Sequence, residues 1–150
     1  MEKKDLITLL DNIFIPLNFK RKGNNWVLND KEITKIINLQ KSQYGNVYYL
    51  HYDYIINSLP LNKRKVHIDN QLGSSDKEEQ KYIQALLNLE NDIDQTERLF
   101  RLDKLIHEKI VSQMKSVQSE EDLLRLLQER TFLYTIPPHV LKHFNLKTEW

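Results

Sequence analysis

Hydrophobic and polar residues alternate with two different periods along the first half of the chain. Apolar residues recur every three to four positions between Leu6 and Phe14, which is the spacing of a buried helix face, and Pro16 marks where that helix ends. Beyond it, turn residues separate segments with the period of two that is typical of strands. The predicted strands are Trp26 to Leu28, Ile33 to Lys41, Val47 to Ile56 and Val66 to Leu72.

From residue 73 onward, the apolar residues follow the helical period of about 3.6. Pairs of a short polar residue and an acidic residue three positions later predict helix starts: Ser75 with Glu78, Asp94 with Glu97, and Ser119 with Asp122. A long helix follows the second start, because one stripe collects Leu99, Leu102, Ile106, Ile110, Met114 and Val117. Pro137 and Pro138 suit the first turn of a last short helix.

The order of these elements predicts an α+β fold. It consists of an N-terminal helix, a four-stranded antiparallel meander, and three to four C-terminal helices packed on one face of the sheet. No repeat, low-complexity tract or linker divides the 150 residues, so a single domain is expected over 1–150. The helix and sheet occupy 1–72 and the helical half occupies 73–150. The long apolar stripe suits the inside of the domain but can also pair two copies, so a monomer or a homodimer is expected.

Composition narrows the class of protein. The chain is 40% hydrophobic and 29% charged, as globular domains are, and no apolar run approaches the roughly 20 residues of a membrane span, so no membrane partner is expected. The absence of cysteine excludes disulfides and thiolate metal sites and agrees with a reducing, cytoplasmic location. Residues 1–72 carry 11 basic and 7 acidic side chains, and residues 73–150 carry 11 and 14, so the halves have charges of +4 and −3. This asymmetry is too small for a general nucleic-acid footprint.

The predicted strand 47–56 is rich in tyrosine. Because side chains alternate along a strand, one face collects Tyr48, Leu50, Tyr52, Tyr54 and Ile56. This face is predicted to be core, with the phenolic hydroxyls at its edge, since an α+β sheet must bury one face. Tyr49 points the other way, toward the polar side of the sheet.

A histidine stands two residues before an aspartate twice on that polar side: His51 before Asp53, and His67 before Asp69. If the third and fourth predicted strands pair antiparallel, all four side chains share one face. The matching residues of the second strand are Asn38 and Gln40. Such pairs can bind a metal ion, act as acid and base, or form a docking face for another protein. The docking face is preferred because no third ligand or orienting group is identified, so no catalytic residue, metal ligand or cofactor is assigned.

Other motifs add little chemistry. His139 and His143 have an i, i+4 spacing that can hold a metal, but the HExxH glutamate is missing and a structural role is expected. The clusters 20–22 and 63–65, each Lys-Arg-Lys, can contact phosphates but also suit solvated loops. A Gly-rich phosphate loop, a GxSxG elbow and a cysteine nucleophile are all absent from the sequence, which excludes several common enzyme classes.

The N-terminal third carries a family pattern. A helix ends in Pro16-Leu17-Asn18-Phe19, basic residues and Gly23 follow, and Trp26 precedes the segment Ile37-Asn38-Leu39-Gln40-Lys41-Ser42. In this order the first 56 residues resemble the bacterial domain-of-unknown-function family 4304. Asn18 replaces the usual glycine, and Val27-Leu28 stand where an aromatic–arginine step is common. The resemblance implies a compact α+β fold and a bacterial origin, and it carries no catalytic residues that could be transferred.

Small families of this sort often resemble immunity proteins, which block a toxin encoded next door. The expected function is therefore that of a non-enzymatic cytosolic binding protein that covers the active site of a cognate toxin. Candidate contact residues lie on the polar sheet face (Tyr49, His51, Asp53, His67, Asp69) and in the acidic helical half (Glu90, Asp92, Asp94, Glu97). The alternative is a metal-dependent hydrolase or other enzyme that uses the four His and Asp side chains. A nucleic-acid-binding domain is the third hypothesis.

Overall fold

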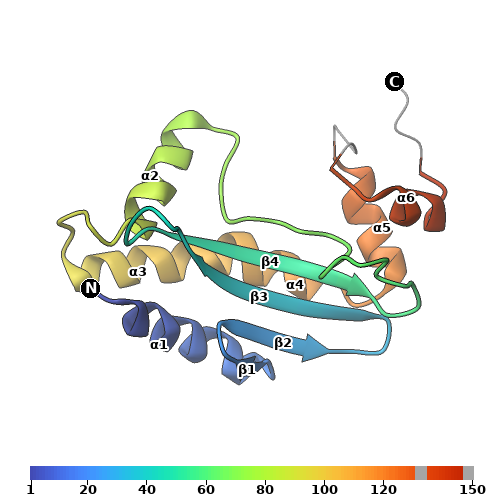
Figure 1. Ribbon diagram of the computed structural model, residues 1–150, viewed down its shortest axis with the longest axis horizontal. Coiled ribbons are helices and arrows are strands. Elements are labelled where there is room, and N and C mark those ends of the chain that lie inside the picture. Colours follow the sequence, from blue (N-terminus) through green and yellow to red (C-terminus); the bar gives the residue numbers. More distant parts are fainter. Residues whose placement is uncertain (131–134, 147–150) are drawn as a thin grey trace.

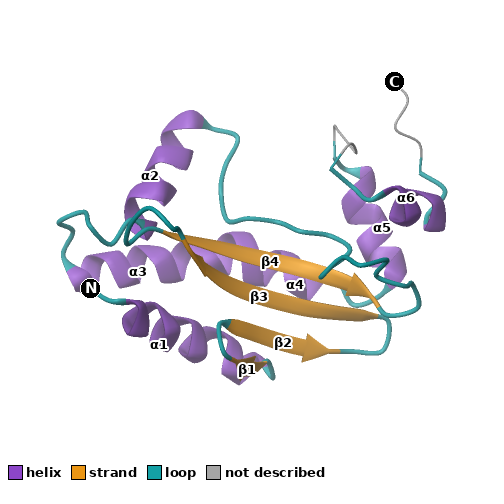
Figure 2. Cartoon of the chain, viewed as in Figure 1, coloured by secondary structure: helices purple, strands orange, loops and turns teal. Residues whose placement is uncertain are grey.

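The structure is a computed structural model that describes residues 1–130 and 135–146. A helix, a sheet and a series of helices follow one another, as Figure 1 shows by sequence colour and Figure 2 by secondary structure. The elements are α1 (Lys3–Phe14), η1 (Ile15–Leu17), β1 (Lys20–Lys22), β2 (Asn25–Asn29), β3 (Ile33–Lys41), β4 (Tyr48–Ile56), α2 (Lys77–Leu87), α3 (Gln95–Ile106), η2 (His107–Val111), α4 (Ser112–Ser116), α5 (Glu120–Gln128) and α6 (Pro138–His143). Within the described ranges, no helix has the length and apolar character needed to cross a bilayer.

The sheet has the strand order β1-β2-β3-β4 and every neighbouring pair is antiparallel, so the predicted meander is confirmed. α3, η2 and α4 follow one another without a break and pass behind β3 and β4 in Figure 1. In that view, no described helix lies over the front face of β2, β3 and β4. One face of the sheet is thus packed against helices and the other remains open, as an α+β layer arrangement allows.

The core forms where the apolar face of β4 meets the helices. Tyr48, Leu50, Tyr54 and Ile56 are each at most 3% exposed, and Tyr52 is half-buried on the same face. The Tyr54 hydroxyl donates to Oε1 of Gln113 at 2.9 Å, so its polar atom keeps a partner inside the protein. The prediction that these tyrosines belong to the core is confirmed.

The first strand is not the one expected from the sequence. Lys20–Lys22 forms β1 and pairs with β2, whereas the sequence pattern predicts a basic cluster before a turn. All three side chains are exposed, so a hydrophobic alternation could not reveal this strand. Strand β1 exists because the turn around Gly23 folds it back onto β2, where it forms the edge of the sheet.

The predicted strand at 66–72 is wrong, because this segment makes only isolated bridges to β4. The bridges are Tyr54 to Ile68 and His51 to Gln71. Between them, the carboxylate of Asp53 accepts the backbone N–H of Asn70 at 3.0 Å, and at the end of β4 the ring of His67 accepts the N–H of Ile56 at 2.8 Å. Side chains therefore occupy places that backbone partners hold in a regular ladder.

Two of the three predicted helix caps are confirmed. The cap accepts the expected backbone N–H in the pairs Asp94 with Glu97 and Ser119 with Asp122. The prediction for Ser75 is wrong, since α2 begins one position later and Asp76 accepts the N–H of Glu79 at 2.9 Å. The hydroxyl of Ser74 in turn accepts the N–H of Asp76, which fixes this start.

Two cations lie inside the protein. Lys35, on the core side of β3, is 3% exposed and borders a cavity of about 170 Å³ between the sheet and the helices. Burial lowers the pKa of its ammonium group, and the carboxylates of Asp30 and Asp122 offset this only in part. Arg98 on α3 is 1% exposed, whereas the neighbouring Leu99, which the sequence predicts in the buried stripe, is only half-buried.

Candidate functional site

Polar residues form a continuous row across the open face of the sheet. The antiparallel register aligns Lys22 with Asn25, Asn25 with Asn38, and Asn38 with His51, and a bridge extends the row to Gln71. Directly paired residues of antiparallel strands point to the same side. The Nδ2 of Asn38 donates to Oδ1 of Asn25 at 2.9 Å, which fixes the middle of the row.

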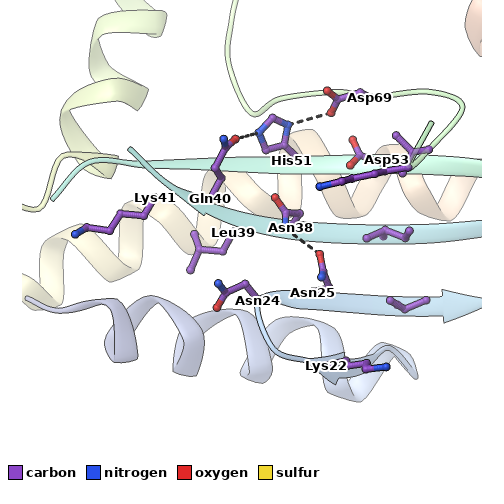
Figure 3. Close-up of a pocket in the computed structure, with 14 residues that line it drawn as sticks. Lys22, Asn24, Asn25, Asn38, Leu39, Gln40, Lys41, His51, Asp53 and Asp69 are labelled. Atoms are coloured by element: carbon purple, nitrogen blue, oxygen red, sulfur yellow. Dashed lines mark hydrogen bonds and ion pairs between the residues drawn. The ribbon is translucent and has the colours of Figure 1, made fainter. Parts of the chain in front are cut away.

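This face is hollowed into a groove with a cavity volume of about 670 Å³, a size typical of small-ligand sites. We call it the sheet groove. Figure 3 shows His51, Asp53 and Asp69 together in its upper part, whereas Lys22 and Lys41 lie toward other margins. The face predicted for His51, Asp53, Asp69, Asn38 and Gln40 is confirmed.

His51 is held from both sides of its ring. Its Nδ1 lies 3.0 Å from Oδ1 of Asp69, and its Nε2 lies 2.8 Å from Oε1 of Gln40 (Figure 3). The side chain is 16% exposed, so the ring has little freedom to turn. Tyr49, the other predicted contact residue of this strand, is half-buried and pairs with Gln40 in the register.

The carboxyl group of Asp53 lies inside the floor of the groove. Asp53 is 6% exposed, and its Oδ1 accepts the Asn70 N–H described above. Burial, together with a hydrogen bond to the carboxyl group of Asp69, raises the pKa of Asp53 to about 8. Two carboxyl groups and an imidazole thus converge at one point.

His67 does not belong to this group, contrary to the sequence prediction. It is 2% exposed, its Nδ1 accepts the Ile56 N–H, and its Nε2 lies 3.0 Å from the carbonyl of Pro60. Since Nδ1 accepts, the proton sits on Nε2 and donates to Pro60, so the ring is neutral. Burial lowers the pKa of His67, which favours this neutral form. The residue is a structural element at the end of β4.

The last two histidines bind different partners. Nε2 of His139 lies 3.1 Å from the carbonyl of Pro60, and Nε2 of His143 pairs with the carboxylate of Glu120. These separate contacts agree with the structural role expected for the i, i+4 pair.

The basic clusters are split between the two faces. Nε of Arg21 lies 3.1 Å from Oδ1 of Asp11 in α1, whereas Lys22 lines the sheet groove. Lys65 of the second cluster also lines the groove. The groove therefore combines lysines with the carboxylates of its floor and is not a uniformly basic phosphate-binding track.

The acidic candidates lie at another part of the surface. Glu90 and Asp92 are exposed in the loop between α2 and α3, and a bridge joins Asn88 of this loop to Val47 of the β3–β4 hairpin. The tip of that hairpin carries Tyr44, which is 90% exposed. The acidic loop and the hairpin thus form one surface.

Two of the acidic candidates have local structural roles. Asp94 caps α3, and the carboxylate of Glu97 pairs with Nε of Arg101. Phe100 on the same helix is 67% exposed. Glu90 and Asp92 are therefore the acidic side chains best placed to meet a partner.

A family model described as a domain of unknown function (DUF4304) matches residues 10–128, well over half of the chain. The chain belongs to the DUF4304 family. The DUF4304 match extends beyond the first 56 residues that carry the sequence resemblance, and it includes the sheet groove and the acidic loop. No curated protein and no solved structure matches the chain.

Sequence patterns missed several groove residues of this DUF4304 protein. Lys22 was not assigned to the polar face because β1 was not recognised as a strand, and Asn25 was missed because β2 was predicted to begin at Trp26. Once Lys20–Lys22 is read as a strand that pairs across Gly23, alternation alone places Lys22 beside Asn25. Lys65 carried no such signal, since it lies in a segment without regular structure.

Proposed function

We propose that this DUF4304 protein is a non-enzymatic, cytoplasmic binding protein, and that its partner is a bacterial toxin whose active site it covers, as immunity proteins do. The observation that carries the proposal is the joined surface of the β3–β4 hairpin and the α2–α3 loop. We call it the hairpin–loop surface and define it by Tyr44, Glu90 and Asp92, all of which are exposed.

An exposed tyrosine is a favourable anchor for a protein partner. Tyrosine is enriched at interface centres because its ring buries a large area while its hydroxyl can donate a hydrogen bond. Tyr44 leaves 90% of its surface to solvent, so the described part of the chain leaves that area free for a partner. Phe100 on α3 adds a second exposed aromatic ring in the helical half.

The backbone under this surface is fixed before any partner arrives. Arg98 donates to the carbonyls of Asn88 and Asn91 at 3.1 and 2.8 Å, which holds the loop that carries Glu90. The hairpin and the loop are also joined through their backbones, because the N–H of Leu89 donates to the carbonyl of Asn46 at 2.9 Å. A surface that is already ordered loses less conformational entropy on binding.

Charge indicates the kind of partner. Glu90 and Asp92 present negative charge that complements a basic cleft, such as the one that a nuclease toxin uses to hold nucleic acid. Complementary charge accelerates association and makes it sensitive to salt, and a stable complex should bury about 1,200–2,000 Å² in total.

The test is affinity capture with purified, tagged protein, followed by growth of cells that co-express the captured protein. The variant carries Tyr44→Ala, Glu90→Lys and Asp92→Lys. A matched control carries Glu108→Lys and Glu129→Lys, which also reverses two exposed acidic residues but lies outside the hairpin–loop surface.

We expect wild type and the control to capture one stoichiometric protein that is toxic alone and tolerated in co-expression. The triple variant should lose both the capture and the protection. Equal protection by the triple variant, or a captured protein without toxicity, would overturn the proposal.

A further inference from the structure

Three possible ligand atoms converge in the floor of the sheet groove. Single ligand atoms of His51, Asp53 and Asp69 all lie within 4.8 Å of one another. They come from β4 and from the segment that runs beside it, so the tertiary structure assembles the group. Figure 3 shows the His51 ring between the side chains of Gln40 and Asp69.

Gln40 decides which nitrogen of His51 faces the carboxylates. Its Oε1 can only accept, so the proton of a neutral imidazole sits on Nε2, 2.8 Å away. Nδ1 then carries a lone pair and lies 3.0 Å from Oδ1 of Asp69. Two acceptors at this distance repel each other unless a cation or a proton lies between them. Metal-binding histidines are oriented in the same manner, with the distal N–H donated to a fixed acceptor.

Asp53 adds an independent argument. Asp53 is only 6% exposed, and its Oδ1 accepts a hydrogen bond from the N–H of Asn70. Among the hydrogen bonds and ion pairs of residues 1–130 and 135–146, none brings an N–H donor or a cation to its Oδ2, and its neighbour in the groove is the carboxyl of Asp69. Two carboxyl groups this close, one of them buried, are unfavourable when both are charged unless a cation or a shared proton lies between them.

We propose that Nδ1 of His51 and the carboxylates of Asp53 and Asp69 bind one divalent transition-metal ion, with Zn²⁺ as the best match. One imidazole nitrogen and two carboxylate oxygens suit Zn²⁺, whereas Mg²⁺ and Ca²⁺ prefer oxygen alone. Ligand atoms about 2.0–2.2 Å from a tetrahedral Zn²⁺ lie roughly 3–3.5 Å apart, close to the observed separation of Nδ1 and Oδ1. Three protein ligands leave a coordination position open toward the groove. Gln40 is a positioning residue that acts through His51.

This site is separate from the hairpin–loop surface, so it stands whether or not a toxin is bound. The first measurement is calorimetric titration of metal-stripped protein with Zn²⁺. The variants are His51→Ala, Asp53→Asn and Asp69→Asn, and circular dichroism checks that each is folded. Asp53→Asn keeps an oxygen for the N–H of Asn70 while it removes the charge. Asp69→Asn is the safest variant for folding, because the Asp69 side chain is 61% exposed.

The control removes another histidine–aspartate pair. Nε2 of His107 lies 3.7 Å from Oδ1 of Asp103 on an exposed helical surface, and among the described residues no third histidine or acidic side chain groups with this pair. The double variant Asp103→Asn/His107→Ala should bind Zn²⁺ as wild type does. Gln40→Ala should weaken binding by about 10-fold or more through loss of ring orientation, and Gln40→Glu should restore it.

We expect one Zn²⁺ per wild-type chain and a loss of affinity of at least about 10-fold in each ligand variant. Failure of wild type to bind Zn²⁺ would overturn the proposal and leave protons as the groups that neutralise this cluster. Binding that is equal in wild type and in folded Asp69→Asn and His51→Ala variants would overturn it as well.

Discussion

Replacing Arg98 with Met should cost the fold about 3–4 kcal/mol. Arg98 is 1% exposed, and its guanidinium donates to the carbonyls of Ala85, Leu86, Asn88 and Asn91, at the end of α2 and in the loop that follows. Hydrogen bonds from a charged donor contribute about 1.5–3 kcal/mol each, and a buried carbonyl left without a donor costs about 1–3 kcal/mol. The Asn91 carbonyl belongs to an exposed residue and can regain water, whereas Leu86 is 2% exposed and cannot.

Methionine also replaces a desolvated cation with a neutral side chain, and this offsets part of the loss in the free energy of unfolding. Burial lowers the pKa of Arg98, so the charged form is disfavoured in the folded protein. The net loss is therefore well below the sum of four hydrogen bonds. Arg98→Lys should fall between wild type and Arg98→Met, because a single ammonium group cannot reach all the carbonyls that the planar guanidinium reaches.

Urea unfolding followed by far-UV circular dichroism gives the free energy of unfolding for each variant. Arg101→Met is the matched control, since it changes the same residue type on the same helix, where the side chain is exposed and pairs with Glu97. It should lower stability much less than Arg98→Met. A loss below about 1 kcal/mol for Arg98→Met, or a loss equal to that of the control, would refute the reasoning that Arg98 stabilises the end of α2 and the loop after it.

Three further variants test particular residues by thermal or urea unfolding. Lys35→Met should raise stability by about 1–2 kcal/mol at neutral pH, because it removes a buried cation. Since the folded pKa of Lys35 lies below the unfolded value of 10.5, wild type should gain stability as the pH rises toward 10.5, and a constant difference between the two proteins would contradict this. His67→Leu should lower stability by about 1–3 kcal/mol, because the Ile56 N–H loses its acceptor, whereas the Pro60 carbonyl keeps its contact with His139. The pKa of His67 is lowered from 6.5, so wild type should lose stability as the pH falls below that value, and the same loss in the variant would argue against the neutral ring. Asn18 has a φ of 74°, in the left-handed region. Asn18→Ala should therefore lower the free energy of unfolding by about 1 kcal/mol, whereas Asn18→Gly should not lower it. Equal effects of the two variants would exclude backbone strain as the cause.

The alternation of side chains determined the middle of the sheet. Residues 33–41 form β3 with the predicted bounds, and β4 begins one residue later than expected. These strands could be read from the sequence because each places apolar residues on one face with a period of two, a property of the strand itself. The helix starts at Asp94 and Ser119 were equally local, since a cap bonds an N–H only three residues away.

The composition of the candidate sites was decided by contacts between distant segments. His51, Asp53 and Asp69 were predicted together by pleat geometry, but His67 was grouped with them although its ring replaces a backbone partner of Ile56. Likewise, the carboxylate of Asp53 takes the N–H of Asn70, which breaks the expected ladder. Strand prediction from alternation takes for granted that backbone groups pair with backbone groups. It cannot show where a side chain forms the hydrogen bond instead.

The tertiary structure alone joined Tyr44 to the acidic loop, more than 40 residues later in the chain, and placed Arg98 among carbonyls that precede it. Local periodicity thus determined the two central strands and their apolar faces, but not the edge strand β1 or the bridged segment at 66–72. Only packing decided which polar groups share a surface, because their positions depend on how whole elements approach one another. The way elements approach one another depends on which contacts bury apolar surface and give buried polar atoms hydrogen-bond partners. Those partners come from distant segments, so no single segment of the sequence reveals them.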